Sequence, residues 1–206
     1  MEKFLQIQKE LVLVEKLTGK KINLAVFISG RGSNLNSLIK YSKYKNSRIN
    51  IKLVISNKSD AKGLKYAKKS KINFFIINYK DNIDPEKKII KNLNNYKIDL
   101  ICLAGFMKIL SKSFINNFKK PILNIHPSLL PKYKGLNTHE RVIKNNDKFS
   151  GSTVHLVTAK LDSGCIILQK KLKILKSDNA KTLEKKILKL EHKLYPEAIS
   201  KFLSNL

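Results

Sequence analysis

The sequence is poor in cysteine and has no long apolar run. Cys102 and Cys165 are its only cysteines, so no disulfide framework is expected. No run of about 18 apolar residues occurs, which predicts that the chain has no transmembrane helix and no membrane partner. The first residues contain no apolar stretch with a small-residue cleavage site, which argues against a secretory signal. We therefore expect a cytoplasmic protein.

Arginine is scarce, although the formal net charge is +27. Among 42 basic residues only Arg31, Arg48 and Arg141 are arginines, and lysines are spread over every segment together with much Asn and Ile. Bidentate recognition of bases and phosphates favours arginine. We interpret most of the charge as the compositional bias of an AT-rich genome. No specific nucleic-acid partner is expected, whereas a positive field would attract anionic small substrates.

Metal-binding motifs are also absent. His139, His155 and His192 show no H-E-x-x-H or cysteine-rich spacing, so we predict no metal. His155 lies within a strand pattern, where a histidine is more often structural. His192 follows Glu191 in the last predicted helix, where this polar pair would either line a site or face solvent.

Short apolar runs alternate with helix-like segments along the chain. The expected strands are Ile22–Ile28, Ile51–Ile55, Phe74–Ile77, Leu100–Leu103, Ile122–Ile125, Thr153–Val157 and Ile166–Leu172. The expected helices are Asn34–Tyr44, Ala61–Lys69, Pro85–Asn95 and a tail from Ala180 to about Asn205 that Pro196 would kink. Apolar strands separated by helices predict an α/β fold with an open, mostly parallel, twisted Rossmann-like sheet and helices on both faces.

The last two predicted strands would pair through the turn at Asp162–Gly164, which adds an antiparallel part near the C-terminus. Residues 1–20 precede the first strand as an extension that we expect to form a short helix without obvious chemistry. Residues 21–206 show no repeat and no linker rich in Gly, Ser or Pro, so we expect one domain. We expect a monomer or a weak homodimer.

The segment Leu123–Pro131 carries the clearest chemistry. In an extended strand, residues i and i+2 point to the same face, so Asn124 and His126 would face one cavity. Pro127 lacks an N–H and would end the strand. A hydrogen-bond donor beside a proton-transfer group suits acyl-group chemistry. Ser128 is a poor nucleophile candidate because no G-x-S-x-G elbow surrounds it.

The loop Ser29–Asn34 follows the first strand and opens a helix. Its glycines permit a tight turn, and the N–H groups of the helix start can bind an anion. The loop matches neither G-x-G-x-x-G nor a P-loop, which favours a monophosphate over a dinucleotide or ATP. A plain strand-to-helix turn is an equally good interpretation of the loop alone.

Two further segments are candidates. Asp162 at a loop tip is either a turn former or, if the loop folds back, a carboxylate that orients His126 and raises its pKa. The segment Leu103–Leu110 lies at the carboxyl end of a predicted strand, where open α/β sheets bind ligands. It would provide either core packing, as for Phe106, or a flat apolar slot for a ring system.

Together these segments resemble the glycinamide ribonucleotide formyltransferase family, the folate-dependent formyltransferases of purine synthesis. The matching motifs are Ser29–Leu35, Ile55–Lys58, Leu103–Met107, Asn124–Pro131, Gly151–His155, Leu161–Gly164, Glu191–His192 and Tyr195–Pro196. The likeness runs from about Lys21 to the C-terminus, with the motifs in the family's order.

The resemblance implies transfer of a formyl group from 10-formyltetrahydrofolate, the co-substrate, to the amine of 5-phosphoribosylglycinamide. The amine would attack the formyl carbon directly, through a tetrahedral oxyanion and without a covalent enzyme intermediate. Asn124, His126 and Asp162 match the catalytic trio. Asn124 would bind the oxyanion, His126 as imidazolium would assist proton transfer, and Asp162 would hold His126 and raise its pKa.

The resemblance also implies binding residues for the two small-molecule substrates. Those for the ribonucleotide are Gly32, Ser33 and Asn34 at the phosphate, with Gly105, Pro127 and Glu191, the last suited to the ammonium end. Those for the folate are Met107, Lys108, Ile109, Leu110, Asn124, Thr158, Ala159, Lys160, Leu161 and Asp162. The family often has an arginine near Tyr79–Asp84 for the folate glutamate tail, whereas this chain offers only Lys80 as a substitute.

Relatives that share the Asn-x-His-Pro segment are alternatives. Methionyl-tRNA formyltransferases add a C-terminal tRNA domain that 206 residues would not accommodate. Formyltetrahydrofolate hydrolases add an N-terminal regulatory domain, and the Gly32–Asn34 loop favours a nucleotide acceptor over both. A basic nucleic-acid-binding protein on a decayed enzyme fold is the alternative from another class, and the intact trio argues against it.

Overall fold

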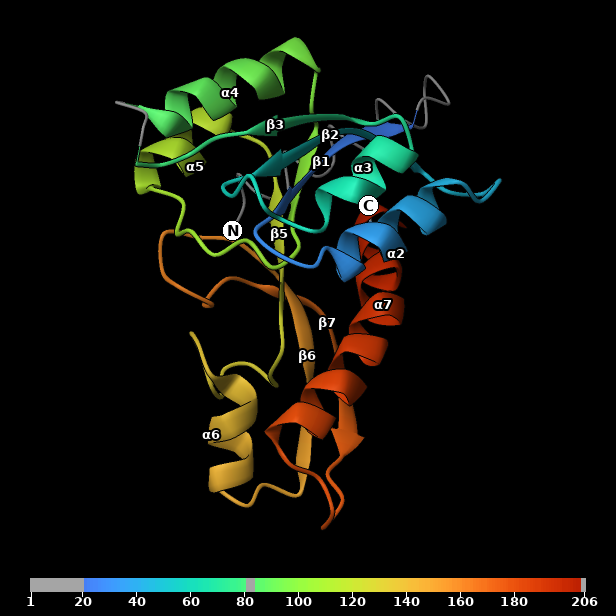
Figure 1. The fold of residues 1–206 in the computed structure, drawn as a ribbon, viewed down its shortest axis with the longest axis vertical. Helices are drawn as coiled ribbons and strands as arrows, with labels where there is room; N and C mark the ends of the chain where they lie inside the picture. The colour runs from blue at the N-terminus through green and yellow to red at the C-terminus, as the bar shows by residue number, and fades with distance from the viewer. Residues whose placement is uncertain (1–20, 81–83, 205–206) are drawn as a thin grey trace.

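A single seven-stranded sheet organises the computed structural model, which describes residues 21–80 and 84–204 (Figure 1). Across the sheet the strands are β3 (Asn73–Ile76), β2 (Ile49–Ser56), β1 (Ile22–Ile28), β4 (Leu100–Leu103), β5 (Ile122–His126), β6 (Phe149–Leu156) and β7 (Ile166–Lys173). The first five are parallel, while β6 and β7 are antiparallel to their neighbours. The predicted mostly parallel sheet with an antiparallel addition is confirmed. The helix predicted within residues 1–20 lies outside the described residues.

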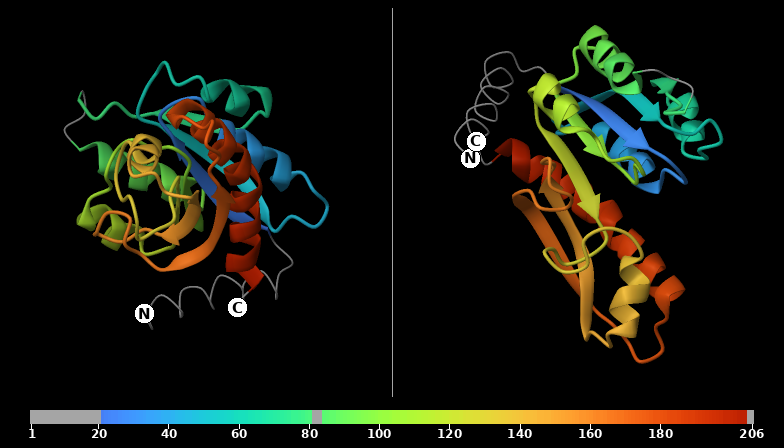
Figure 2. Two further views of the ribbon diagram at one scale, coloured as in Figure 1. Left: turned by 90° about the horizontal axis from the view of Figure 1, so that it is seen from below. Right: turned by 90° about the vertical axis from the view of Figure 1, so that its left-hand side faces the viewer.

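Helices cover both faces of the sheet (Figures 1 and 2). One face packs against α2 (Ser33–Ser42), α3 (Leu64–Lys69) and α7 (Ala180–Ser204), and the other against α4 (Pro85–Asn95) and α5 (Lys112–Phe118). Along β1, Leu24 and Val26 join the first core, whereas Ala25 and Phe27 join the second. Because side chains alternate across a strand, a strand covered on both sides must be apolar throughout, and every residue of β1 is buried.

A smaller part of the molecule lies beyond the parallel strands. There α6 (Thr138–Lys144) packs Val142 against Leu183 and Ile187 of α7, beside the far ends of β6 and β7 (Figure 2). Neither α5 nor α6 was predicted, because seven residues hold too few turns to show a helical repeat. In the described part of the chain, no helix combines the length and apolarity needed to cross a membrane.

Several element boundaries differ from the predicted ones. Strand β6 begins at Phe149 rather than Thr153, because Ser150, Gly151 and Ser152 are small residues that give little apolar signal. A Cβ on Gly151 would lie 2.1 Å from the carbonyl oxygen of Lys170, so this position accepts only glycine without movement of β7. Helix α3 begins at Leu64 rather than Ala61, and α7 continues as one helix through Pro196.

Candidate functional site

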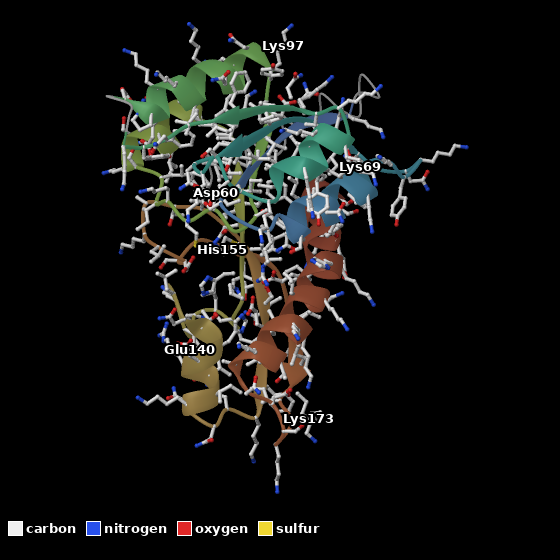
Figure 3. The ribbon with its side chains drawn as sticks, viewed as in Figure 1. Asp60, Lys69, Lys97, Glu140, His155 and Lys173 are labelled. Carbon is white, nitrogen blue, oxygen red and sulfur yellow. The ribbon has the colours of Figure 1, made fainter. Side chains whose placement is uncertain are left out.

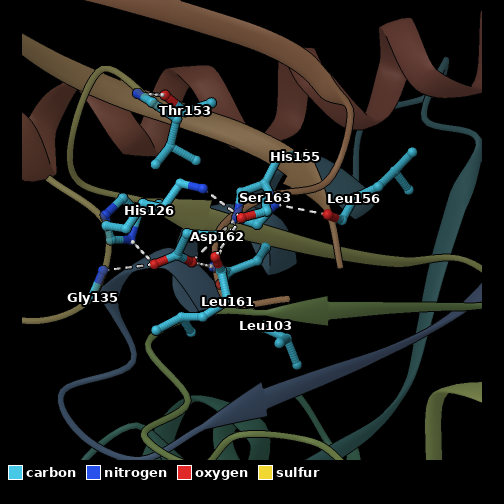
Figure 4. Close-up of polar contacts among 12 residues, drawn as sticks. Leu103, His126, Gly135, Thr153, His155, Leu156, Leu161, Asp162 and Ser163 are labelled. Carbon is cyan, nitrogen blue, oxygen red and sulfur yellow. Dashed lines mark hydrogen bonds and ion pairs between the residues drawn. The ribbon is translucent and has the colours of Figure 1, made fainter. Parts of the chain in front are cut away.

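The three residues of the predicted catalytic trio come together at the carboxyl end of β5. Asn124 and His126 lie two residues apart on the strand, so their side chains share one face, and Asp162 reaches His126 from the β6–β7 connection (Figure 4). Oδ2 of Asp162 lies 3.4 Å from Nδ1 of His126, and its Oδ1 lies 3.5 Å from Nδ2 of Asn124. His126 and Asp162 are both buried, so a proton on His126 would interact with the carboxylate more strongly than it would in water.

The backbone of the β6–β7 connection explains how Asp162 reaches this position. Asp162 adopts a left-handed φ of 45°, which turns the chain back over the sheet. A Cβ on Gly164 would lie 1.8 Å from the carbonyl oxygen of Leu156, so only glycine permits this close return. The amide of Gly135 then donates to Oδ2 of Asp162 at 2.9 Å. The Asp162–Gly164 turn therefore holds a carboxylate inside the site.

The pKa of His126 is lowered in the structure, whereas the sequence led us to expect that Asp162 would raise it. Nε2 of His126 donates to the carbonyl oxygen of Tyr133 at 2.8 Å, because a carbonyl can only accept. Burial lowers the pKa of His126, and the contributions of the Tyr133 carbonyl and of Asp162, which raise it, do not outweigh that effect. Asp162 thus acts in the predicted direction, but the net pKa lies below the ordinary value for histidine. His126 is therefore mostly neutral at pH 7 in the free protein.

His155, which the sequence pattern suggested to be structural, contacts two of the three residues of the predicted trio. Its Nδ1 donates to the carbonyl of Leu156 at 2.8 Å, and its Nε2 lies 3.2 Å from Nδ2 of Asn124 and 3.6 Å from Oδ1 of Asp162. It lies near the middle of the molecule in Figure 3 and on the opposite side of Asp162 from His126 in Figure 4. In the antiparallel pairing of β5 and β6, His155 lies directly opposite Asn124. Knowledge of this register would have identified His155 as a neighbour of the trio.

Asp162 is ionised between these two imidazoles. Burial alone would raise the pKa of Asp162, but the neighbouring His155 ring, the hydrogen bond from the Gly135 amide and the electrostatic effect of His126 bring it below its usual value. The Asp162 carboxylate, 3.4 Å from Nδ1 of His126, stabilises a proton on that ring. The cluster is therefore able to hold a positive charge transiently although His126 is neutral at rest.

A second polar group lies where α2 meets α7. Nδ2 of Asn34 donates to Oε2 of Glu191 at 2.8 Å, and Ser152 Oγ lies 3.2 Å from Oε1 of Glu191 and 2.8 Å from the carbonyl oxygen of His126. Burial raises the pKa of Glu191. The buried Oδ1 of Asn34 has no partner among the described residues. Ser152 thus connects the catalytic strand to a buried carboxylate beside the start of α2.

The start of α2 has the geometry of an anion site. Gly32 precedes the helix with a φ of 69°, and no side chain caps the first N–H groups, which include that of Ser33. A Cβ on Gly63 would lie 2.8 Å from the Cα of Gly32, so two glycine backbones pack directly on each other. The amide of Gly63 also donates to the carbonyl of Gly30 at 2.9 Å. The start of α3 therefore shapes the loop that leads into α2.

Gly105 and Pro127 lie at the same edge of the sheet. Gly105 has a φ of 76° and accepts a hydrogen bond from the amide of Ser29 at 3.1 Å, which joins the ends of β4 and β1. No atom lies within 4 Å of a Cβ built on Gly105, so its surface is open to a ligand. Pro127 follows His126 directly and ends β5, as its missing N–H predicts.

The segments predicted to bind folate carry exposed apolar side chains. Met107 is 62% exposed, Ile109 74% and Leu161 52%, whereas the predicted wall residue Leu110 is buried in the second core. The ring of Phe106 packs edge-on against Phe27, so its part is core packing. Lys108 lies over the ring of Tyr79, and Thr158, Ala159 and Lys160 complete the loop before Leu161.

The predicted substitute Lys80 is exposed, and part of the segment around it lies outside the described residues. No cluster of three or more His, Cys, Asp or Glu side chains suited to a metal ion occurs among residues 21–80 and 84–204.

Comparisons with known proteins agree with this geometry. The profile described as formyl transferase matches residues 22–199. The phosphoribosylglycinamide formyltransferase of Haemophilus influenzae is 42% identical over 182 residues, covering 87% of this chain and 86% of that protein. The human trifunctional purine biosynthetic protein adenosine-3 is also 42% identical, but the match spans only 18% of that longer protein.

A solved structure is similar over the same region. The crystal structure of phosphoribosylglycinamide formyltransferase from Brucella melitensis matches with a TM-score of 0.86 and 41% identity, covering 91% of this chain and 98% of that one. The formyl transferase profile, over residues 22–199, spans the strands and helices that build the site described above. This chain therefore belongs to the formyl transferase family.

Proposed function

We propose that this chain transfers a formyl group from 10-formyltetrahydrofolate to the amine of 5-phosphoribosylglycinamide, a step of de novo purine biosynthesis. The observation that carries the proposal is the connection through Ser152, whose Oγ lies 2.8 Å from the carbonyl of His126 and 3.2 Å from Glu191. It joins a proton-transfer cluster to a buried acceptor site beside an anion-binding helix start. A substrate with a phosphate and a reacting amine needs an anion site for the phosphate and a proton acceptor near the amine.

The phosphate would bind at the start of α2. The free N–H groups after Gly32 and the positive end of the helix favour an anion there. The hydroxyl of Ser33 and the amide of Asn34 lie on the first turn and would supply further hydrogen bonds. The chain's net charge of +27 would speed the approach of an anionic substrate.

Glu191 would hold the amine end of the ribonucleotide. A carboxylate that is already buried and hydrogen-bonded by Asn34 and Ser152 has one orientation, so it positions a donor without loss of side-chain freedom. The raised pKa of Glu191 reflects the cost of burying its charge, and a bound ammonium would offset that cost. Gly105 and Pro127 would leave room for the ribonucleotide at the sheet edge.

At the formyl group, Asn124 would stabilise the oxygen that gains charge when the amine attacks. Its contact with Asp162 is 3.5 Å long and weak, so a substrate oxygen would replace it while the 3.2 Å contact with His155 keeps the amide in place. Nδ1 of His126 is the ring nitrogen free to take up the proton that the amine loses. Asp162, 3.4 Å away, would stabilise the imidazolium until the proton passes to the departing folate nitrogen.

The folate would lie against the apolar side chains of Met107, Ile109 and Leu161. Exposed apolar side chains at a site favour binding of a ring system, because the ring covers them and removes their apolar surface from water. The loop Thr158–Asp162 would form the wall on the catalytic side. At the other end of the folate site, Leu110 would contribute its backbone, because its side chain is buried in the core.

The test is an assay of the purified chain with both substrates. Release of tetrahydrofolate should match the formylated ribonucleotide formed one to one, as measured by absorbance and mass spectrometry, and the reaction should need the ribonucleotide. Formate release without an acceptor would support a hydrolase instead, and formylation of methionyl-tRNA would support the other relative. Binding of duplex DNA at physiological salt without formyl transfer would refute the enzyme assignment.

We also propose that the protein acts in the cytoplasm as a monomer or weak homodimer, with no metal and no specific nucleic-acid partner. Light scattering during size exclusion should give a mass near 23.6 kDa at low concentration. Turnover should persist after treatment with a chelator. A stable tetramer or a chelator-sensitive rate would contradict these expectations.

A further inference from the structure

Arg141 of α6 is one of three arginines among 42 basic residues, and its contacts use the shape of the guanidinium group. Its Nη1 donates to the carbonyls of Lys134 at 2.6 Å and Leu136 at 3.3 Å. Its guanidinium carbon lies 5.3 Å from the centre of the Tyr133 ring. A planar group can stack on a ring and bind carbonyls at its edge, whereas a lysine ammonium is a single point of charge.

These contacts hold residues 133–137, which we call the 133–137 loop. The loop presents two backbone groups to the catalytic cluster: the carbonyl of Tyr133 binds Nε2 of His126 at 2.8 Å, and the amide of Gly135 binds Asp162 at 2.9 Å. Tyr133, Gly135 and Asn137 all have left-handed φ angles between 55° and 77°. No regular ladder fixes such a backbone, so its shape depends on side chains outside it.

Tyr133 is held from three sides. Its hydroxyl donates to Asp147 at 3.0 Å and accepts from Asn145 at 2.9 Å, while its ring faces Arg141. Because the Tyr133 carbonyl positions His126, displacement of the ring would move the acceptor of the catalytic imidazole. Arg141 is the contact that joins the Tyr133 side of the loop to the Leu136 side.

We propose that Arg141 is a positioning residue for formyl transfer, which keeps the 133–137 loop in the shape that fixes His126 and Asp162. The inference rests on the proposed function. Arg141 acts through the loop backbone and contacts neither His126 nor Asp162 directly. Such contacts keep the reacting groups in place to within a fraction of an ångström. Small displacements of those groups lower kcat strongly.

Arg141 also contributes charge to the same histidine. Burial is the largest cause of the low pKa of His126, and the charges of His155 and Arg141 lower it further, against the Tyr133 carbonyl and Asp162. His139 of α6 also lies within electrostatic reach of His126. Arg141→Lys keeps the positive charge but loses the planar group. Arg141→Gln loses the charge but keeps an N–H donor, so the two variants separate geometry from electrostatics.

The experiment measures kcat, KM and the titration of the His126 ring by NMR in both full-length variants. Each variant should lower kcat about tenfold, with KM for the ribonucleotide within about twofold, because the loop lies apart from α2. Arg141→Gln should raise the pKa of His126, and Arg141→Lys should leave it nearly unchanged. The matched control is Arg48→Lys, which removes a guanidinium that donates to the Leu203 carbonyl at 2.5 Å outside the site, and it should keep kcat within about twofold.

A kcat within about twofold of the unmodified chain in both Arg141 variants would overturn the proposal. An equal fall in Arg48→Lys would also overturn it, because the effect would then reflect general destabilisation. If the unmodified chain transfers no formyl group, the proposed function fails, and the NMR titration still decides whether Arg141 acts on His126. If Arg141→Gln does not fold, Arg141→Lys with its retained charge carries the kinetic test.

Discussion

Nδ1 of His126 and Oδ2 of Asp162 lie 3.4 Å apart, and these two atoms define where a proton can reside in the site. Nε2 of His126 is committed to the Tyr133 carbonyl at 2.8 Å, so protonation changes occur at Nδ1. A neutral imidazole next to an ionised carboxylate is poised to accept a proton.

His126→Ala should lower kcat by about 10²–10⁴, because general acid–base catalysis typically contributes that much. The side chain lies at the end of β5, so the sheet should form without it. Far-UV circular dichroism and thermal unfolding check the fold, and steady-state kinetics measures the rate. A rate close to that of the unmodified chain would remove His126 from the chemistry.

Asp162→Asn should move the acid limb of kcat/KM to lower pH and reduce its plateau. Asp162 raises the pKa of His126, so loss of its charge lowers that pKa, and neutral His126 persists to more acidic pH. The shift is measured from pH–rate profiles under both substrate-limiting conditions. An acid limb that stays in place would show that another group controls it.

Glu191→Gln should raise KM for the ribonucleotide about tenfold or more, since a charged hydrogen bond is replaced by a neutral one. Burial raises the pKa of Glu191, so removal of its charge should leave the melting temperature unchanged or higher. A glutamine can still accept from Asn34 and donate to Ser152. Calorimetry and kinetics together test this, and a lower melting temperature with unchanged KM would assign Glu191 to structure alone.

Gly63→Ala should weaken ribonucleotide binding and leave the folate KM nearly unchanged. Its Cβ would lie 2.8 Å from the Cα of Gly32, so the loop before α2 must shift. Lys62→Ala is the control, because Lys62 is an exposed neighbour in the same turn. Titration calorimetry with the ribonucleotide separates the two variants. Equal affinities would mean that the loop tolerates the added methyl group.

Much of the fold follows from local patterns. The run Ile22–Ile28 is apolar at every position because both faces of β1 are covered, and that run is visible without coordinates. Short elements such as α5 and α6 were missed because seven residues show no clear helical period. Strand β6 began earlier than expected because Gly151 packs closely against β7 and its serine neighbours are polar, so this half of the strand has little apolar signal.

For the site, the order of residues along the chain was enough to show which chemical groups are available and which of them share a face. The two-residue spacing of Asn124 and His126 and the glycine loop before α2 are local features, so they could be read along the chain. Tertiary packing, in contrast, brings Asp162 to His126, places His155 beside Asn124 across β6, and lets Arg141 hold the 133–137 loop. It also decided the direction of the His126 pKa, because that direction is a balance between burial and charges that come from distant parts of the chain.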